Sequence, residues 1–187
     1  MIENKFMDHL EAIVKIDQII GDDFCDDISN HIDKINLSNM GMISGVDKKG
    51  RNVLGYTLQK KDKILFKKIG KKIEDLYLYY KIKFLKTVNN QKINQIDLLK
   101  YSVGGKYGAH IDSVTDVTRS ISVILNLNNQ YKGGSLIFMN PMNINEKIKE
   151  IQLKKGSIVF FPSNFLYPHQ ISPITEGTRY SIVAWLQ

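Results

Sequence analysis

The spacing of apolar residues changes along this chain, from a helical period to a strand period at about residue 93. Before that point, Phe24, Ile28, Ile32 and Ile35 lie four, four and three residues apart. This spacing predicts an amphipathic helix over 22–35, with Asp22 placed to cap its first turn. A second helix is predicted over 70–86, on Ile73, Leu76, Tyr77, Tyr80 and Phe84. Short strands are expected within 12–19 and 53–66.

From residue 93 onward, apolar and polar residues alternate in short segments separated by turn signals such as Gly104-Gly105, Gly133-Gly134, Gly156 and Gly177. Many short strands at this spacing predict a sandwich or barrel. Helices first and strands later predict an α+β fold, with a double-stranded β-helix (jelly roll) and N-terminal flanking helices. We expect a single domain over 1–187, in which 1–92 is a helical N-terminal support and 93–187 is the jelly-roll core.

Length and composition are those of one globular domain. The chain has 187 residues, 43% of them hydrophobic, and no apolar run approaches the ~18 residues that span a bilayer, so no membrane partner is expected. The opening MIENKFMDHL lacks the apolar core of a secretory signal. The single Cys25 reads as a small buried helix residue and cannot form an internal disulfide. We therefore expect a reducing, cytoplasmic compartment.

The net charge of +7 is unevenly spread: residues 1–33 carry −7, and residues 60–86 hold ten lysines against three acids. A basic stretch can attract nucleic acid or an acidic protein. Its lysines alternate with apolar residues, which favours a solvated face. The stretch 40–52 contains three glycines and predicts a loop, either one that closes on a substrate or a plain surface loop. The sequence gives no indication of the oligomeric state.

Two predicted strands carry polar residues on one face. In RSISVILNL, Ile121, Val123, Leu125 and Leu127 alternate with Ser120, Ser122 and Asn126, which suits a strand that lines a polar cavity. In TRYSIVAW, one face carries Arg179, Ser181, Val183 and Trp185. An inward-pointing arginine requires an anion, and its planar fork suits a carboxylate. An internal salt bridge to Asp or Glu is the alternative.

His110 and Asp112 are two residues apart, so on a strand both point to one face. With His169 they would complete a facial set of two histidines and one carboxylate, which is the metal site of non-haem Fe(II) oxygenases. His-x-Asp also occurs by chance, and a lone histidine is more often a core or surface residue.

These motifs occur in order: YSVGGKYGAHIDS at 101–113, then RSISVILNLN and GGSLIF, then GSIVFFPSNFLYPHQISPITEGTRYSIVAW at 156–185. Together they resemble the Fe(II)- and 2-oxoglutarate-dependent oxygenases, within them the prolyl 4-hydroxylase branch. The resemblance implies that His110, Asp112 and His169 bind Fe(II), and that Arg179 binds the distal carboxylate of 2-oxoglutarate.

The resemblance also implies roles for residues around the metal. Tyr101 matches a tyrosine that hydrogen-bonds the co-substrate, Asn126 stands where some relatives place a tyrosine against the same carboxylate, and Ser181 would add a hydroxyl. Tyr107, Arg119 and Trp185 match positions that border the substrate pocket. The plainer alternatives are that Trp185 packs the barrel and that Arg119 pairs with an acid such as Asp116.

The implied reaction is hydroxylation of an unactivated C–H with O2, coupled to decarboxylation of 2-oxoglutarate to succinate and assisted by ascorbate. The expected substrate is a prolyl residue in a peptide or protein; a free amino acid, a small molecule or a nucleic-acid base is the alternative. Asp112 argues against halogenation. Nucleic-acid demethylases usually add a second arginine six residues after the first, where this chain has Trp185. A non-redox metal-binding jelly roll has no need of Arg179.

Overall fold

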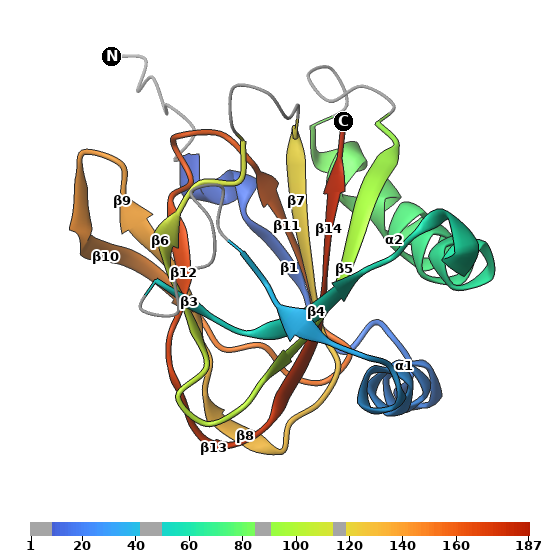
Figure 1. The fold of residues 1–187 in the computed structure, drawn as a ribbon. Helices are drawn as coiled ribbons and strands as arrows, with labels where there is room; N and C mark the ends of the chain where they lie inside the picture. The colour runs from blue at the N-terminus through green and yellow to red at the C-terminus, as the bar shows by residue number, and fades with distance from the viewer. Residues whose placement is uncertain (1–8, 42–49, 85–90, 114–118) are drawn as a thin grey trace, which may run out of the picture.

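Two antiparallel sheets packed face to face form the body of the molecule, and two helices cover the outer face of the larger sheet (Figure 1). The computed structural model describes residues 9–41, 50–84, 91–113 and 119–187. The larger sheet has the order β1-β11-β7-β14-β5-β4-β2, the smaller β10-β9-β12-β6-β3, and β13 pairs with β8. The predicted α+β jelly roll with N-terminal flanking helices is confirmed.

The first half of the chain contains η1 (His9–Ala12), β1 (Val14–Ile16), α1 (Asp22–Lys34), β2 (Ser38–Asn39), β3 (Arg51–Asn52), β4 (Leu54–Thr57), η2 (Lys60–Asp62) and α2 (Lys63–Lys83). The second half contains β5 (Ile93–Tyr101), β6 (Lys106–His110), β7 (Ile121–Asn126), β8 (Tyr131–Gly133), β9 (Leu136–Asn140), β10 (Asn143–Ile151), β11 (Ile158–Pro162), β12 (His169–Ile171), β13 (Ile174–Gly177) and β14 (Arg179–Leu186).

The larger sheet is buried on both faces, and alternate residues of each strand serve different cores. On β7 and β14, Val123, Leu125 and Ile182 pack under the helices. Ile124 and Val183, on the opposite face, belong to the core between the two sheets. The predicted alternation along both strands is therefore present, and it leaves Ser122, Ser181 and Arg179 on the inner face.

The first helix matches its prediction, except at its N-terminus. Gly21 is the N-cap and no side chain caps the helix, so the prediction that Asp22 caps it is wrong. Asp22 is instead the first helical residue, where its negative charge still favours the helix dipole. Cys25 is fully buried, as predicted, and burial raises the pKa of its thiol to about 11.

The second helix begins earlier than predicted, at Lys63, and ends at Lys83. The strand predicted over 53–66 stops at Thr57. The helical period in fact extends back from Ile69 to Leu65 and Phe66, which pack against the core. Asp62 also accepts a hydrogen bond from the backbone of Gln59, which closes a capping box just before the helix.

The N-terminal segment contributes strands as well as helices. β1 pairs with β11 and β4 pairs with β5 in the larger sheet, while β3 forms an edge of the smaller sheet against β6. Most of the loop predicted over 40–52 lies outside the described residues, and Arg51 and Asn52 at its end form β3.

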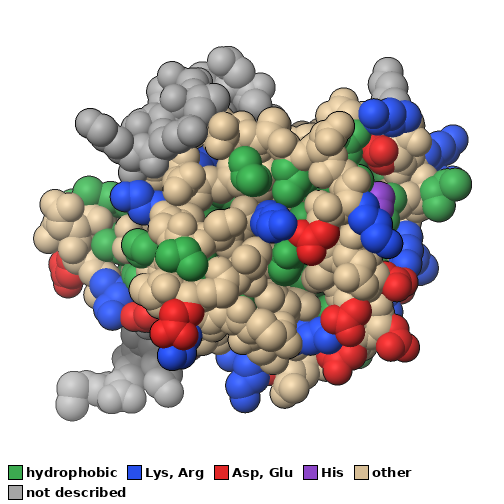
Figure 2. All heavy atoms as spheres, turned by 60° about the horizontal axis from the view of Figure 1, so that its bottom comes forward, with side chains coloured by type: hydrophobic (Ala, Val, Ile, Leu, Met, Phe, Trp, Pro, Cys, Tyr) green, Lys and Arg blue, Asp and Glu red, His purple; other side chains and the backbone are tan. Residues whose placement is uncertain are grey.

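Acidic and basic side chains lie interspersed on the face shown in Figure 2. Acids of α1 pair with lysines of other elements: Lys68 with Asp27 at 3.3 Å, and Lys155 with Asp26 at 2.7 Å. Exposed lysines of α2 include Lys63, Lys67 and Lys71. This arrangement fits the solvated-face interpretation of the basic stretch. None of the helices in the described parts of the chain is long and apolar enough to cross a membrane.

Phe160 should be a main anchor of α2 on the sheet. Its buried ring lies 6.1 Å from that of Tyr77 and 5.7 Å from that of Tyr80. Phe160→Ala should lower the free energy of unfolding by about 3–5 kcal/mol, because it leaves a cavity in the core. Phe165→Ala, at an exposed site, should change it by less than about 0.5 kcal/mol. Denaturant unfolding of both variants measures the difference, and equal losses would contradict this view of the core.

Candidate metal centre and its pocket

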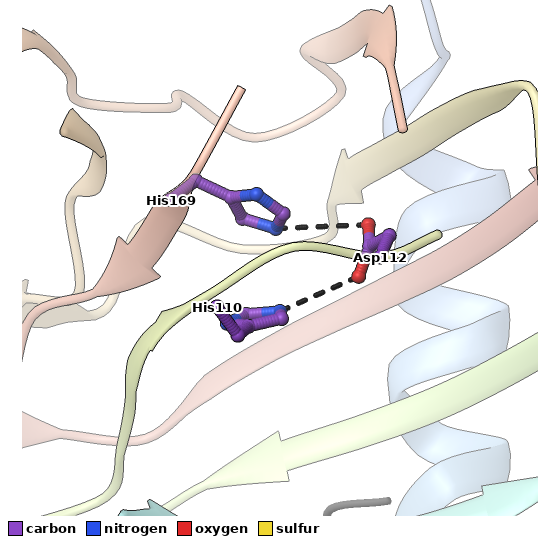
Figure 3. A group of neighbouring side chains, drawn as sticks. All are labelled: His110, Asp112 and His169. Atoms are coloured by element: carbon purple, nitrogen blue, oxygen red, sulfur yellow. Dashed lines mark ion pairs between the residues drawn. The ribbon is translucent and has the colours of Figure 1, made fainter. Parts of the chain in front are cut away.

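Two neighbouring strands of the smaller sheet bring His110 and His169 together. The two residues are direct partners in the β6–β12 ladder, and their ring centroids are 4.3 Å apart. Asp112 follows the end of β6 and points between the two rings (Figure 3). Its Oδ1 lies 3.4 Å from His110 Nε2 and its Oδ2 lies 3.6 Å from His169 Nε2. One ligand atom from each of the three residues lies within 4.8 Å of the others.

A backbone carbonyl fixes the orientation of each imidazole. His110 Nδ1 lies 2.8 Å from the oxygen of Gly108, and His169 Nδ1 lies 3.0 Å from the oxygen of Tyr167. A carbonyl oxygen can only accept, so each Nδ1 carries the hydrogen and donates it. Each Nε2 is therefore left facing Asp112, as is usual for histidines that bind metals.

A buried serine of the other sheet holds the Asp112 carboxylate, and a second buried serine contacts the first. Ser122 on β7 donates its hydroxyl to Asp112 Oδ2 at 2.6 Å and lies 2.8 Å from the Ser163 hydroxyl. Burial raises the pKa of Asp112, but His169, His110 and Ser122 outweigh burial and hold this pKa well below its usual range. Burial, together with His110, lowers the pKa of His169 to about 4, so this imidazole is neutral at pH 7.

Arg179 lines the same pocket as His110, Asp112 and His169, and it has no anionic partner among the described residues. Arg179 is the first residue of β14 and lies opposite Tyr101 in the ladder. The residue is 1% exposed, and its guanidinium carbon lies 5.3 Å from the Tyr101 ring centroid. Nε and Nη2 of Arg179 make no hydrogen bond within the described parts of the chain. The alternative of an internal salt bridge is thus not seen there. Gly134, at φ +65°, leaves room for the arginine stem, since an added Cβ would lie 3.0 Å from Arg179 Cδ.

Tyr101 and Tyr107 line the pocket together with the triad and Arg179. Burial raises the pKa of the Tyr101 phenol, which therefore stays protonated and able to donate. The Tyr107 ring stacks on the His110 ring, with centroids 3.6 Å apart.

Asn126 and Ser181 do not line this pocket. The Asn126 amide donates to the carbonyls of Asn128 and Leu153 and accepts from the Tyr131 hydroxyl, so its polar atoms are occupied by protein. The Ser181 hydroxyl is buried and has no partner among the described residues. It shares the inner face of β14 with Arg179.

A second cavity, called the outer cavity below, adjoins the pocket of the triad and Arg179, which is called the inner pocket. Arg119 and Trp185 line it, and the guanidinium of Arg119 stacks 3.7 Å above the Trp185 ring. Arg119 also donates to the Asp112 carbonyl at 3.2 Å and to Gln95 Oε1 at 3.2 Å. The pairing suggested with Asp116 falls outside the described residues. Trp185 lies in the walls of both cavities rather than only packing the barrel.

Sequence reasoning missed Arg51, Ser122 as a partner of Asp112, and Ser163. Arg51 lines both cavities, and its guanidinium carbon lies 4.3 Å from the Tyr107 ring centroid. Its place in a glycine-containing, weakly patterned stretch gave no signal. The sequence did predict that Ser122 faces inward, but it did not indicate that its hydroxyl contacts Asp112.

Comparisons with known proteins agree with this site. A family model described as the 2OG-Fe(II) oxygenase superfamily matches residues 96–187. Over these residues the chain is similar to that superfamily. It is 31% identical over 103 residues to a PKHD-type hydroxylase of Prochlorococcus marinus, covering 52% of this chain and 43% of that protein. It is 33% identical over 96 residues to one of Shewanella oneidensis, covering 47% and 40%. The chain thus spans less than half the length of these relatives.

Solved structures share the fold over nearly the whole chain. A viral collagen prolyl hydroxylase from Paramecium Bursaria Chlorella virus-1 has a TM-score of 0.69 at 20% identity, over 94% of this chain and 95% of that one. A Trichoplax adhaerens prolyl hydroxylase, solved with a hypoxia inducible factor peptide fragment, has 0.75 at 18%, over 95% and 85%. These structures confirm the jelly-roll fold, and the family model confirms the predicted resemblance to the 2OG-Fe(II) oxygenases.

The residues present fit the groups that this superfamily uses. Two imidazole nitrogens and a carboxylate suit Fe(II). The buried Arg179 guanidinium, which has no anionic partner among the described residues, suits a carboxylate of 2-oxoglutarate.

Ser122→Ala should weaken metal binding although Ser122 is not itself a ligand. Loss of its hydrogen bond frees the Asp112 carboxylate to rotate, which should lower the Co(II) affinity by about 10–100-fold. Ser102→Ala, at an exposed position, is the control and should leave the affinity unchanged. Calorimetric titration of both variants with Co(II) measures the effect. Equal affinities would show that Ser122 does not orient the carboxylate.

Proposed function

We propose that this chain is an Fe(II)- and 2-oxoglutarate-dependent dioxygenase that hydroxylates an unactivated C–H bond, with decarboxylation of 2-oxoglutarate to succinate. One observation carries the proposal: Arg179, buried beside a two-histidine, one-carboxylate set, has unpaired N–H groups and no carboxylate partner among the described residues. Leaving such a group unpaired is costly, which favours an anionic guest at this position.

The roles of the residues follow from their chemistry. His110, Asp112 and His169 would hold Fe(II), and Arg179 would bind the distal carboxylate of 2-oxoglutarate, with Tyr101 as a hydroxyl donor in the pocket. Ser181, which does not line the pocket, would support Arg179 from the same face of β14. Bound iron and 2-oxoglutarate would supply the O2-dependent oxidation. Leu99, Ile124 and Val183 form apolar walls that exclude water from the pocket. Since the Asn126 side chain is already hydrogen-bonded to protein, we assign it a supporting role rather than contact with the co-substrate.

A prolyl residue in a peptide or protein is the substrate that we propose. Its support is the prolyl hydroxylase identity of several structural neighbours and the presence of Tyr107, Arg119 and Trp185 around the outer cavity. We further propose that 1–187 acts as one domain, with 1–92 supporting the core at 93–187. A single, buried cysteine fits a cytoplasmic setting, and we propose ascorbate as the reductant that keeps iron in the Fe(II) state.

The proposal is tested by supplying Fe(II), ascorbate, O2 and 2-oxoglutarate together with proline-containing peptides. Succinate should form, and the peptide should gain 16 Da in mass. His110→Ala should abolish both because it removes one of three ligands. A proteome-wide search for +16 Da modifications that depend on His110 would identify the substrate. Failure to bind 2-oxoglutarate and failure to turn over any peptide would together reject the oxygenase proposal.

Arg179→Gln should separate a co-substrate clamp from a packing residue. The loss of a charged double hydrogen bond should lower the affinity for 2-oxoglutarate by roughly 10–100-fold, while Arg179→Lys, which keeps the charge without the fork, should fall between. Lys132→Gln, at an exposed ion pair with Glu176, is the control. Calorimetry in the presence of Zn(II) measures these affinities without turnover. A non-redox metal protein would show no 2-oxoglutarate binding at all.

A further inference from the structure

The outer cavity opens directly beside the candidate metal centre. Arg51, Tyr107, Asp112 and Trp185 line both this cavity and the inner pocket, so they form the wall between the two spaces. A substrate whose C–H bond approaches the metal ligands from the outer cavity would pass these four residues. The chemistry of the outer cavity therefore limits what the substrate can be.

Three hydrogen-bond donors in this cavity have no partner among the described residues, while two of its acceptor atoms, Asp97 Oδ1 and Gln95 Oε1, are already occupied. The Nε groups of Arg51 and Arg119 and the Trp185 Nε1 are buried without a partner among the described residues. Asp97 accepts from Thr57 at 2.8 Å and from Gln95 at 2.9 Å, and Gln95 Oε1 accepts from Arg119. Unpaired donors predict a guest that brings acceptors.

The charges of the outer cavity also favour a guest with hydrogen-bond acceptors. Arg51 and Arg119 face this cavity with Asp97 and Asp112, and no ion pair joins either arginine to a carboxylate in the described parts of the chain. Asp112 belongs to the metal set, and Arg179 would be matched by 2-oxoglutarate. Among the described residues, one positive charge of the outer cavity then has no negative counterpart. An acceptor that also carries a negative charge would balance it.

Arg51 is held in place for this role. Its Nη1 donates to the Gly41 carbonyl at 2.6 Å, and its guanidinium lies over Tyr107, whose ring in turn stacks on His110. A planar guanidinium fixed in this way matches the geometry of a carboxylate.

We propose that Arg51 is a specificity-determining residue that selects, together with Arg119, a substrate with a carboxylate close to the carbon that is hydroxylated. This inference rests on the proposed function. The carboxylate has two possible sources: an acidic side chain next to the modified residue, or the free carboxyl group of the modified residue itself.

The test uses the protein loaded with Zn(II) and 2-oxoglutarate, so that no turnover occurs. Trp185 is the only tryptophan of the chain, and it lines the cavity, so its fluorescence reports binding there directly. One pair of probes is N-acetyl-L-proline and N-acetyl-L-prolinamide. The other pair is acetyl-prolyl-glutamyl amide and its glutaminyl counterpart. The first pair tests a free carboxyl group, and the second tests an acidic side chain.

In at least one pair, the carboxylate probe should bind about tenfold more tightly than the amide, or more, since hydrogen bonds to charged groups are the stronger ones. Arg51→Gln should reduce this preference to less than about twofold, and Arg51→Lys should retain part of it. Lys106→Gln is the matched control: it removes the same charge from a half-buried residue of β6 that lines neither cavity, and it should leave the preference intact.

Three results would overturn the inference. They are no preference for either carboxylate probe, no binding of these probes, or a preference that survives Arg51→Gln. The affinity for 2-oxoglutarate, measured by calorimetry in the same variants, should stay within about twofold of wild type, because Arg179 remains in place. A fall in this affinity with Arg51→Gln would instead assign Arg51 to the co-substrate. Loss of 2-oxoglutarate binding by the wild-type protein would reject the proposed function itself, so the two failures are distinguishable.

Discussion

Burial of the larger sheet on both faces is the constraint on which the rest of the structure depends. Each central strand must present apolar residues to the helices and a second set of residues to the space between the sheets. Ile182 and Ser181 are neighbours on β14, yet one packs under the helices and the other lies on the inner face. A register slip of one residue would move Arg179 into the helix-facing core. The pattern that folds the sheet therefore also places the pocket residues.

Both sheets meet at Asp112. The smaller sheet supplies His110 and His169 as direct ladder partners, and each is oriented by the carbonyl of the residue two positions before it. The larger sheet supplies Ser122, which reaches Asp112 Oδ2 at 2.6 Å. The geometry of the triad thus depends on how the sheets pack against each other. A change in that packing would therefore alter the position of the Asp112 carboxylate.

The sequence predicted the parts of this structure that follow from local period. Alternation along β7 and β14, the apolar face of α1 and the triad spacing were all readable. The start of α2 was not, because Leu65 and Phe66 fit either period, and only packing against the core decides between them. Arg51 was not readable either, since its function depends on β3 lying beside β6, with Arg51 opposite Tyr107 in the ladder. Side chains placed by long-range pairing leave no local signal.

The position of Arg179 lowers the stability of the fold but suits the binding of an anion. The buried Arg179 guanidinium, whose Nε and Nη2 have no acceptor among the described residues, destabilises the fold by an amount comparable to a lost charged hydrogen bond, about 1–3 kcal/mol or more. The surroundings limit this cost without satisfying the charge: the face of the Tyr101 ring lies nearby, and Gly134 admits the arginine stem. Neither contact supplies an acceptor. A chain selected for stability alone would have placed a carboxylate beside Arg179. The guanidinium of Arg179 is therefore best explained as part of a binding site for an anion.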